Sequence, residues 1–373
     1  MQQIFGDAHY IERLEPDVLS ATLHSLMSFH PSGFLLLACD EENTDLSAYN
    51  TMLRSLDIPV FGGIFPSIIR NKQTIESGIL VIPVFAPLEV QVFEGVSKCH
   101  EQAFNISFAM QDFSSTLMLI DGLTRGIGNA MNQVFQEYGQ SKVVFGGGAG
   151  SLSFQQKPCL FTPNGIVQDA MILVAIKQDF ELAIGHGWEV LDGPFLANQV
   201  DDNQILQLNF EPAVDVYREV IKRFDGRDID SDNFFEIATN YPFGLERLDE
   251  KLLVRDPITL NDKALVCVGR VPESTMLYIL KGDPNNLISA AAKAIEDKLQ
   301  NQAASSALLF DCISRKLFLE DEFAQELQGI NNSLGENTSL FGALVLGEIA
   351  SNKAGGIDLH NKTAVTAIVV QHD

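Results

Sequence analysis

The chain has 373 residues, of which 46% are hydrophobic and 20% are charged, with 25 Phe and a single Trp. This is the composition of a globular protein with room for two domains of ordinary size. The formal net charge of −24 repels the phosphates of nucleic acids and anionic lipid head groups, so we expect no nucleic-acid or membrane partner.

The first half of the chain predicts strands and helices in alternation. A strand over residues 33–40 is followed by a helix and then by Val60-Phe61-Gly62-Gly63. Apolar runs and their periodicity predict the later elements. Strands are expected over residues 77–84, 88–93, 115–121, 142–145 and 170–176, and helices over residues 100–112 and 126–138.

The second half repeats this order. A helix over residues 211–224 has Pro212 in its first turn, a favoured position for proline. Strands are expected over residues 262–268, 275–280, 306–311, 339–347 and 364–370, and helices over residues 285–298 and 320–328. The offset between matching elements stays near roughly 190 residues, as expected for a duplicated domain. A weaker third occurrence is the strand, helix and Val-Phe-Gly-Gly near the start.

The fold class predicted is α/β, with mixed sheets flanked by helices, because hairpin-like strand pairs interrupt the alternation. We expect two similar domains that arose by internal duplication, with turn signals marking a boundary between residues 178 and 206. The division adopted is residues 1–190 and residues 191–373.

Five cysteines lie far apart in the sequence, without a C-x-x-C pair, and the first residues lack a basic start followed by an apolar run. Reduced thiols and the absence of a signal peptide predict a cytoplasmic protein without a disulfide framework or a zinc–cysteine site.

A glycine-rich stretch follows the strand at residues 142–145. Its glycines let the backbone approach a ligand closely and direct N–H groups toward it. The alternative is a tight turn that packs against a neighbouring strand. The stretch matches neither a Rossmann fingerprint nor a P-loop. The glycines predicted to bind a ligand are Gly146, Gly147, Gly148 and Gly150. Residues 121–128 likewise join a strand to a helix. They either hold an anionic group at the N-terminus of that helix or serve only as the connection between the two elements.

Polar residues at strand ends in the second half are further candidates. Arg315, after the strand at 306–311, suits a carboxylate. Glu348 ends an apolar strand and either caps a loop or lines a pocket for an ammonium group. Cys312 suggests thiol catalysis, although no orienting partner can be assigned and a packing role is more usual. His186 and His360 are either packed histidines or ligands for iron.

Taken in order, these segments resemble the FIST family (F-box and intracellular signal transduction). The likeness covers roughly residues 30–370, and it departs from the family at Ser314, where a glycine is common, and over the aliphatic residues 339–346. The segments are Phe61-Gly62-Gly63, residues 144–150, residues 170–176, Gly185-His186-Gly187-Trp188, the helix at 212–220, residues 310–315, Gly347-Glu348-Ile349 and His360-Asn361-Lys362-Thr363.

The resemblance implies a bacterial sensory protein, not an enzyme, that binds a small ligand between its two related domains and regulates a separate partner such as a histidine kinase. An amino acid would place its carboxylate on Arg315 and its ammonium group on Glu348. The alternative is a haem-based nitric oxide sensor, with His186 or His360 as the axial ligand. A hydrolase that uses Cys312 is the third hypothesis.

Overall fold

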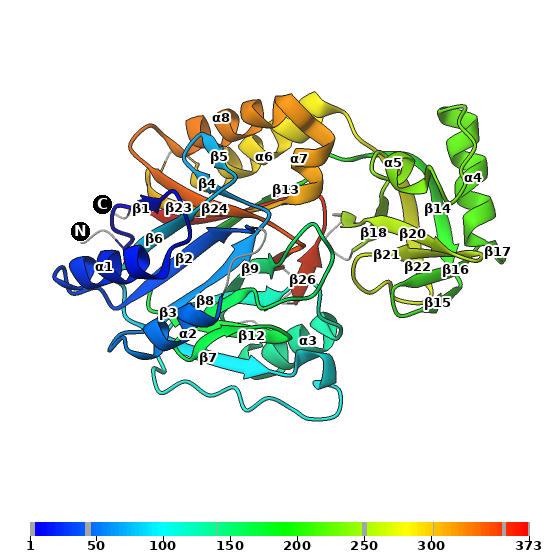
Figure 1. Ribbon diagram of the computed structural model, residues 1–373. Coiled ribbons are helices and arrows are strands. Elements are labelled where there is room, and N and C mark those ends of the chain that lie inside the picture. The colour runs from blue at the N-terminus through cyan, green and yellow to red at the C-terminus, as the bar shows by residue number, and fades with distance from the viewer. Residues whose placement is uncertain are drawn as a thin grey trace.

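The computed structural model describes residues 4–41, 46–139, 141–247, 252–300, 302–352 and 356–371. It consists of a body and a smaller lobe, residues 189–281, that is inserted into the body and lies to its right in Figure 1. The lobe has a hydrophobic core of its own, formed wholly from residues between Ala197 and Ile279. The lobe therefore has the packing of a separate folding unit.

The body contains one structural unit three times. Each unit has an edge strand, two parallel central strands joined through a helix, a hairpin, and a last strand antiparallel to the first central strand. Unit 1 comprises β1 (His9–Ile11), α1 (Pro16–Met27), β2 (Gly33–Cys39), α2 (Ser47–Arg54), β3 (Val60–Phe65), β4 (Ser67–Arg70), β5 (Gln73–Ile75) and β6 (Ile79–Val84). Unit 2 comprises β7 (Leu88–Glu94), η1 (Val96–Lys98), β8 (Ser115–Asp121), α3 (Ile127–Tyr138), β9 (Val143–Ala149), β10 (Leu160–Thr162), β11 (Gly165–Val167) and β12 (Ala170–Ile176).

Unit 3 is interrupted by the lobe, which follows its edge strand. Unit 3 comprises β13 (Glu181–Gly185), α6 (Pro284–Leu299), β23 (Ala304–Cys312), α7 (Ile313–Leu319), η2 (Glu320–Glu322), α8 (Phe323–Leu334), β24 (Ser339–Val345), β25 (Glu348–Ser351), β26 (Ile357–His360) and β27 (Ala364–Val370). The lobe comprises β14 (Glu189–Ala197), β15 (Gln199–Asp201), β16 (Gln204–Leu208), β17 (Glu211–Pro212), α4 (Ala213–Phe224), α5 (Phe234–Ala238), β18 (Phe243–Glu246), β19 (Leu252–Arg255), β20 (Pro257–Asn261), β21 (Ala264–Cys267) and β22 (Thr275–Lys281).

The hairpins join the three units in a closed cycle. The hairpin of unit 1 pairs through β4 with β24 of unit 3, that of unit 3 pairs through β25 with β9 of unit 2, and that of unit 2 pairs through β10 with β3 of unit 1. Each six-stranded sheet of the body therefore contains strands from two units, and removing one unit would leave an unpaired edge on a neighbour.

The sheets enclose one central core and carry helices on their outer faces. Side chains of a strand alternate between its two faces, and β23 shows the consequence. Its Leu308 and Phe310 join the central cluster, whereas Leu309 joins a second cluster with α6 and α8. Figure 1 shows these helices covering the outer side of their sheet.

A Phe-Gly pair recurs at the same place in all three units. In each unit the glycine of this pair lies opposite a residue of the first central strand. A Cβ atom added to the glycine would lie 1.9 Å (Gly62), 1.9 Å (Gly146) or 2.2 Å (Gly342) from the backbone carbonyl oxygen of that opposite residue. No side chain fits at such a distance, so the recurring glycine is required for the two parallel strands to approach.

Replacing Gly146 with alanine is therefore expected to lower the free energy of unfolding by about 2–3 kcal/mol, through overpacking. On the exposed side of α3, a Cβ added to Gly128 would meet nothing within 4 Å. Alanine at Gly128 should instead raise stability by about 0.5 kcal/mol, because glycine disfavours helix. Urea denaturation of the two variants checks both signs; equal effects would contradict this account of the glycine.

The mixed α/β class predicted from the sequence is confirmed, and so are most of the predicted strands. The helix predicted over residues 100–112 is wrong: this segment has no helix. Its apolar residues recur at every second position, and Ile106 and Phe108 are buried. Its backbone N–H groups donate to side chains of β7 and α3, such as Glu89 and Gln133, which replace helical hydrogen bonds.

The predicted repeat is present, and its weaker first occurrence is a complete unit. The strands predicted at 262–268 and 275–280 belong to the sheets of the lobe, so their expected match to residues 77–93 was wrong. The division at residues 190 and 191 stays a prediction, because strand pairing follows the three units and crosses that point.

Candidate functional site

The predicted polar site residues gather where unit 3 meets the lobe. Arg315 lies on α7, and its guanidinium donates to the backbone oxygen of His186, in the link from β13 to the lobe, at 2.7 Å. Glu348 and His360 are paired residues of β25 and β26, and Glu348 also faces Gly147 of β9. Segments separated by up to 200 residues therefore meet in one region, as the sequence-based hypothesis requires.

Arg315 is completely buried and all of its N–H groups are used. It forms two bonds with the Glu326 carboxylate of α8, and it donates to the backbone oxygens of His186, Lys362 and Leu287. A guanidinium has five N–H donors, so none is left over. The predicted carboxylate clamp exists, but it holds a carboxylate of this chain; a ligand would have to displace Glu326.

Carboxyl groups outnumber cations around Arg315. Asp311 and Glu348 are also fully buried, and the nearer Asp311 oxygen lies 3.4 Å from the Arg315 Nε. Among the described residues, neither oxygen of Asp311 has a hydrogen-bond partner, and only one oxygen of Glu348 accepts a bond, from the Thr363 N–H at 3.2 Å. The cluster is therefore rich in acid and poor in donors.

Burial raises the pKa of both Asp311 and Glu348 well above the ordinary carboxyl range, and the neighbouring Glu326 carboxylate raises that of Asp311 further. Desolvation penalises the charged form of a buried carboxyl group. Both groups therefore favour the protonated form, which the single Arg315 cation does not offset.

The Glu348→Gln variant, which mimics a protonated carboxyl group, is expected to change how stability depends on pH. A raised folded pKa stabilises the fold below the unfolded pKa, about 4.3 for Glu, and that contribution is lost as pH rises toward the folded pKa. The loss is up to about 1.4 kcal/mol per pH unit for one group.

Relative to the wild type, Glu348→Gln should gain stability between pH 5 and pH 8, as measured by urea denaturation at each pH. Glu94→Gln, at an exposed position of β7, is the control and should follow the wild type. Parallel pH profiles for Glu348→Gln and the wild type would refute the expectation.

The lobe is fastened to the body through Asp256, Ser314 and Lys362, which we call the latch. The Lys362 Nζ lies 3.2 Å from an Asp256 oxygen and donates to the Thr239 backbone oxygen at 3.1 Å, while the Ser314 hydroxyl donates to Asp256 at 3.1 Å. Asp256 and Thr239 belong to the lobe; Lys362 and Ser314 belong to the body. A buried ion pair is thus one of the contacts between lobe and body.

The backbone around the latch is tied down as well. Lys362 has a left-handed backbone (φ +51°), and its carbonyl oxygen accepts from the Trp188 indole N–H at 3.0 Å. Arg255, beside Asp256, donates to the Leu359 backbone oxygen at 2.7 Å. Non-glycine residues with positive φ store strain and cluster at functional positions.

The glycine stretch is filled by protein. A Cβ on Gly147 would lie 2.8 Å from a Val345 side-chain carbon, and one on Gly148 would lie 2.6 Å from the Leu346 backbone oxygen. These contacts come from β24 and the turn after it, so the glycines admit a neighbouring strand where the sequence suggested a hollow. This arrangement supports the packing alternative; ligand binding by Gly146, Gly147, Gly148 and Gly150 stays a prediction.

The ring of His186 is not arranged to bind a haem iron, while an iron-ligand role for His360 stays a prediction. The Nδ1 of His186 accepts the Trp188 backbone N–H at 3.0 Å. A neutral imidazole that accepts at Nδ1 carries its proton on Nε2, so neither nitrogen offers iron a lone pair. His360 lies in a strand beside Glu348, and neither of the two hollows described below is lined by His186 or His360.

Cys312, the proposed nucleophile, is buried at the end of β23. Burial raises the pKa of its thiol well above the usual value. Because the thiolate is the reactive form, this arrangement holds Cys312 in its unreactive form.

Sequence reasoning assigned no role to Asp256, Asp311, Glu326 or Lys362. Asp311 carried a usable signal, because it is a carboxylate at the end of a strand expected to be buried. Lys362 lay inside a quoted motif. Asp256 and Glu326 are recognised only through their three-dimensional partners.

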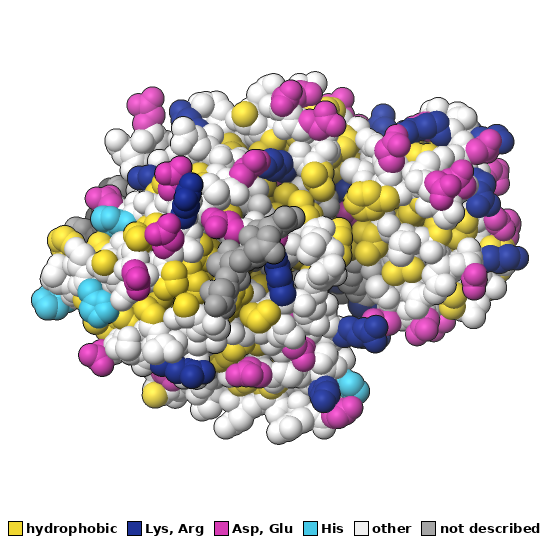
Figure 2. Space-filling view, in the orientation of Figure 1, with side chains coloured by type: hydrophobic (Ala, Val, Ile, Leu, Met, Phe, Trp, Pro, Cys, Tyr) yellow, Lys and Arg dark blue, Asp and Glu magenta, His cyan; other side chains and the backbone are white. Residues whose placement is uncertain are grey.

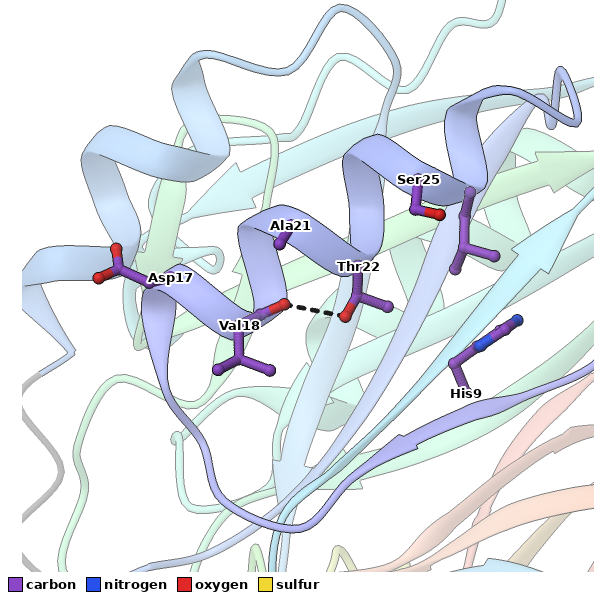
Figure 3. Close-up of a pocket in the computed structure, with 7 residues that line it drawn as sticks. His9, Asp17, Val18, Ala21, Thr22 and Ser25 are labelled. Atoms are coloured by element: carbon purple, nitrogen blue, oxygen red, sulfur yellow. Dashed lines mark hydrogen bonds between the residues drawn. The ribbon is translucent and has the colours of Figure 1, made fainter.

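Two hollows lie elsewhere on the described surface. An open groove of about 530 Å³ lies between β1 and α1. Figure 3 shows the side chains that line it, among them His9, Asp17 and Val18. The Thr22 hydroxyl there donates to the Val18 backbone oxygen within the helix, so it is already used locally. The second hollow, of about 110 Å³, lies at the carboxyl ends of β2 and β3.

Charges on the face seen in Figure 2 are mixed: Lys and Arg side chains lie scattered among Asp and Glu, with no single large basic patch. Within the described ranges, no helix is both long and apolar enough to cross a membrane. The same residues contain no group of three or more His, Cys, Asp or Glu side chains placed to hold a metal ion.

Two domain models of one known family match the chain, with their boundary inside the lobe. The FIST N domain model matches residues 33–211, and the FIST C domain model matches residues 213–351. The chain therefore belongs to the FIST family, with its N- and C-terminal regions side by side in the sequence, as the resemblance implied. FIST domains are associated with sensory signal transduction. No curated protein matches the chain.

Proposed function

We propose that this protein is a sensory module that binds a small ligand and reports the binding to a separate signalling protein, such as a histidine kinase, through a change in the position of its lobe. The family supports the sensory role. The observation that carries the proposal is the latch, where the buried Asp256–Lys362 ion pair joins the lobe to the body, beside apolar contacts of Val254 and Leu280 with the body.

A buried ion pair suits a contact between lobe and body that must change when a ligand binds. Their attraction is largely offset by the cost of removing both charges from water, so a small change in geometry shifts the balance. Burial raises the pKa of Asp256 even though Lys362 opposes the shift. The strained backbone of Lys362 adds to the energy stored in the docked state.

Hydrogen–deuterium exchange on the whole protein tests the proposal. A panel of amino acids, small amines and small carboxylic acids is first screened for thermal stabilisation. A compound that binds should change exchange at Thr239, Asp256 and residues 359–363, and should alter the autophosphorylation of a histidine kinase partner. Compounds that bind without changing exchange at the latch would refute the role of the lobe.

A haem-based nitric oxide sensor remains the alternative, although the ring of His186 is arranged against it. An absorption spectrum with added haem decides between them: a Soret band that shifts with nitric oxide and is lost in His186→Ala or His360→Ala would establish it. We expect no catalysis; turnover abolished by Cys312→Ala would contradict that.

A further inference from the structure

The first central strand of every unit ends at or next to an aspartate. Asp40 follows β2, Asp121 ends β8, and Asp311 is the penultimate residue of β23. These strands pair in parallel with β3, β9 and β24. The carboxyl ends of parallel strands are a preferred place for ligands in α/β proteins.

In units 2 and 3, nitrogen-bearing side chains of this chain occupy that place. The Gln156 amide donates to Asp121 at 2.7 Å. The Arg315 guanidinium lies 3.4 Å from Asp311 and also binds Glu326. A strand-end carboxylate thus accepts a hydrogen bond from an amide in unit 2 and lies near a guanidinium in unit 3.

Unit 1 differs because its strand end is hollow. The pocket of about 110 Å³ is lined by Leu14, Cys39, Asp40, Glu41, Leu46, Ile64, Lys157 and Pro158. Lys157, the neighbour of Gln156, forms an ion pair with one oxygen of Asp40 from the rim, where its side chain is 38% exposed. The Lys157 side chain pairs with one oxygen of the Asp40 carboxylate but does not fill the pocket.

The lining favours a cation. Asp40 and Glu41 supply two carboxylates against the single ammonium of Lys157, and the whole chain carries a net charge of −24, which attracts cations and repels anions. Burial raises the pKa of the Cys39 thiol to about 12, so it contributes no charge at neutral pH. Leu14, Leu46 and Ile64 form an apolar wall.

We propose that this pocket binds a small organic ammonium compound, whose N–H groups donate to Asp40 while a short apolar chain lies against Leu46 and Ile64. A signalling role for this pocket rests on the proposed function, whereas the binding of an ammonium compound to the pocket does not. The bound ammonium group would then share the Asp40 carboxylate with Lys157.

Calorimetric titration of the whole protein with n-butylammonium tests the inference, with butyrate and 1-butanol as the anionic and neutral counterparts at the same ionic strength. Only n-butylammonium should bind the wild type. Asp40→Asn should weaken it about tenfold, as loss of a charged hydrogen bond predicts, and Leu46→Trp, which fills the cavity, should abolish it. The control Asp57→Asn, at an exposed position, should bind as the wild type does.

Absence of n-butylammonium binding, equal binding to Asp40→Asn, or stronger binding of butyrate would overturn the inference. Hydrogen exchange at the latch separates this result from the proposed function. Binding of n-butylammonium without a change at the latch would refute the signalling role alone. A different compound that changes the latch while n-butylammonium fails to bind would refute the site alone.

Discussion

Replacing Arg315 with methionine is expected to lower the free energy of unfolding by about 3–5 kcal/mol, the usual cost of removing one partner of a buried ion pair. The variant leaves Glu326 buried beside Asp311 without a cation, and it leaves the backbone oxygens of His186, Lys362 and Leu287 without their donor. Chemical denaturation at neutral pH measures the loss.

Two further variants show whether charge causes the loss. Arg125→Met, at an exposed position, should change stability by less than about 0.5 kcal/mol. The double variant Arg315→Met with Glu326→Met should recover part of the loss, because it removes both unlike charges together. A double variant as unstable as the sum of its single variants would show that packing, not charge, explains the loss.

Replacing Lys362 with methionine is expected to separate the unfolding of the lobe from that of the body. Asp256 then loses its buried cation and Thr239 its donor, at a cost of about 3 kcal/mol to the contact between the two parts. Because the lobe has its own core, it should unfold as a unit below the melting temperature of the body.

Differential scanning calorimetry measures this outcome as two transitions where the wild type has one. Lys222→Met is the matched control, since Lys222 pairs with Asp228 on the exposed surface of the lobe. It should keep a single transition, because exposed ion pairs contribute little. One unchanged transition for Lys362→Met would mean that the latch does not couple the lobe to the body.

The candidate site was predictable in its location but not in its contacts. Arg315 and Glu348 stood out because charged residues at the ends of apolar strands need a partner. Their partners, Glu326 and the Thr363 backbone, come from other elements, and a single sequence does not state which side chain will meet which. Arg315 was therefore predicted to bind the carboxylate of a ligand, whereas it binds the Glu326 carboxylate of this protein.

The irregular segment after η1 shows another limit. Residues 100–112 were expected to be helical, yet Ile106 and Phe108 are buried in an extended chain. Its backbone N–H groups donate to the side chains of Glu89 and Gln133, which are distant in sequence. Helical propensity is a weak preference of a few tenths of a kcal/mol per residue, and such tertiary bonds readily override it.

By itself, the sequence determined the strands and the recurring Phe-Gly pair, because apolar runs and a glycine forced by close strand approach are local requirements. Only the tertiary structure decided that the hairpins are exchanged in a cycle, that residues 189–281 form a separate lobe, and that the glycine stretch is packed shut. These three features depend on which surfaces pack against each other. The free energy that stabilises this packing comes from contacts between residues far apart in the chain.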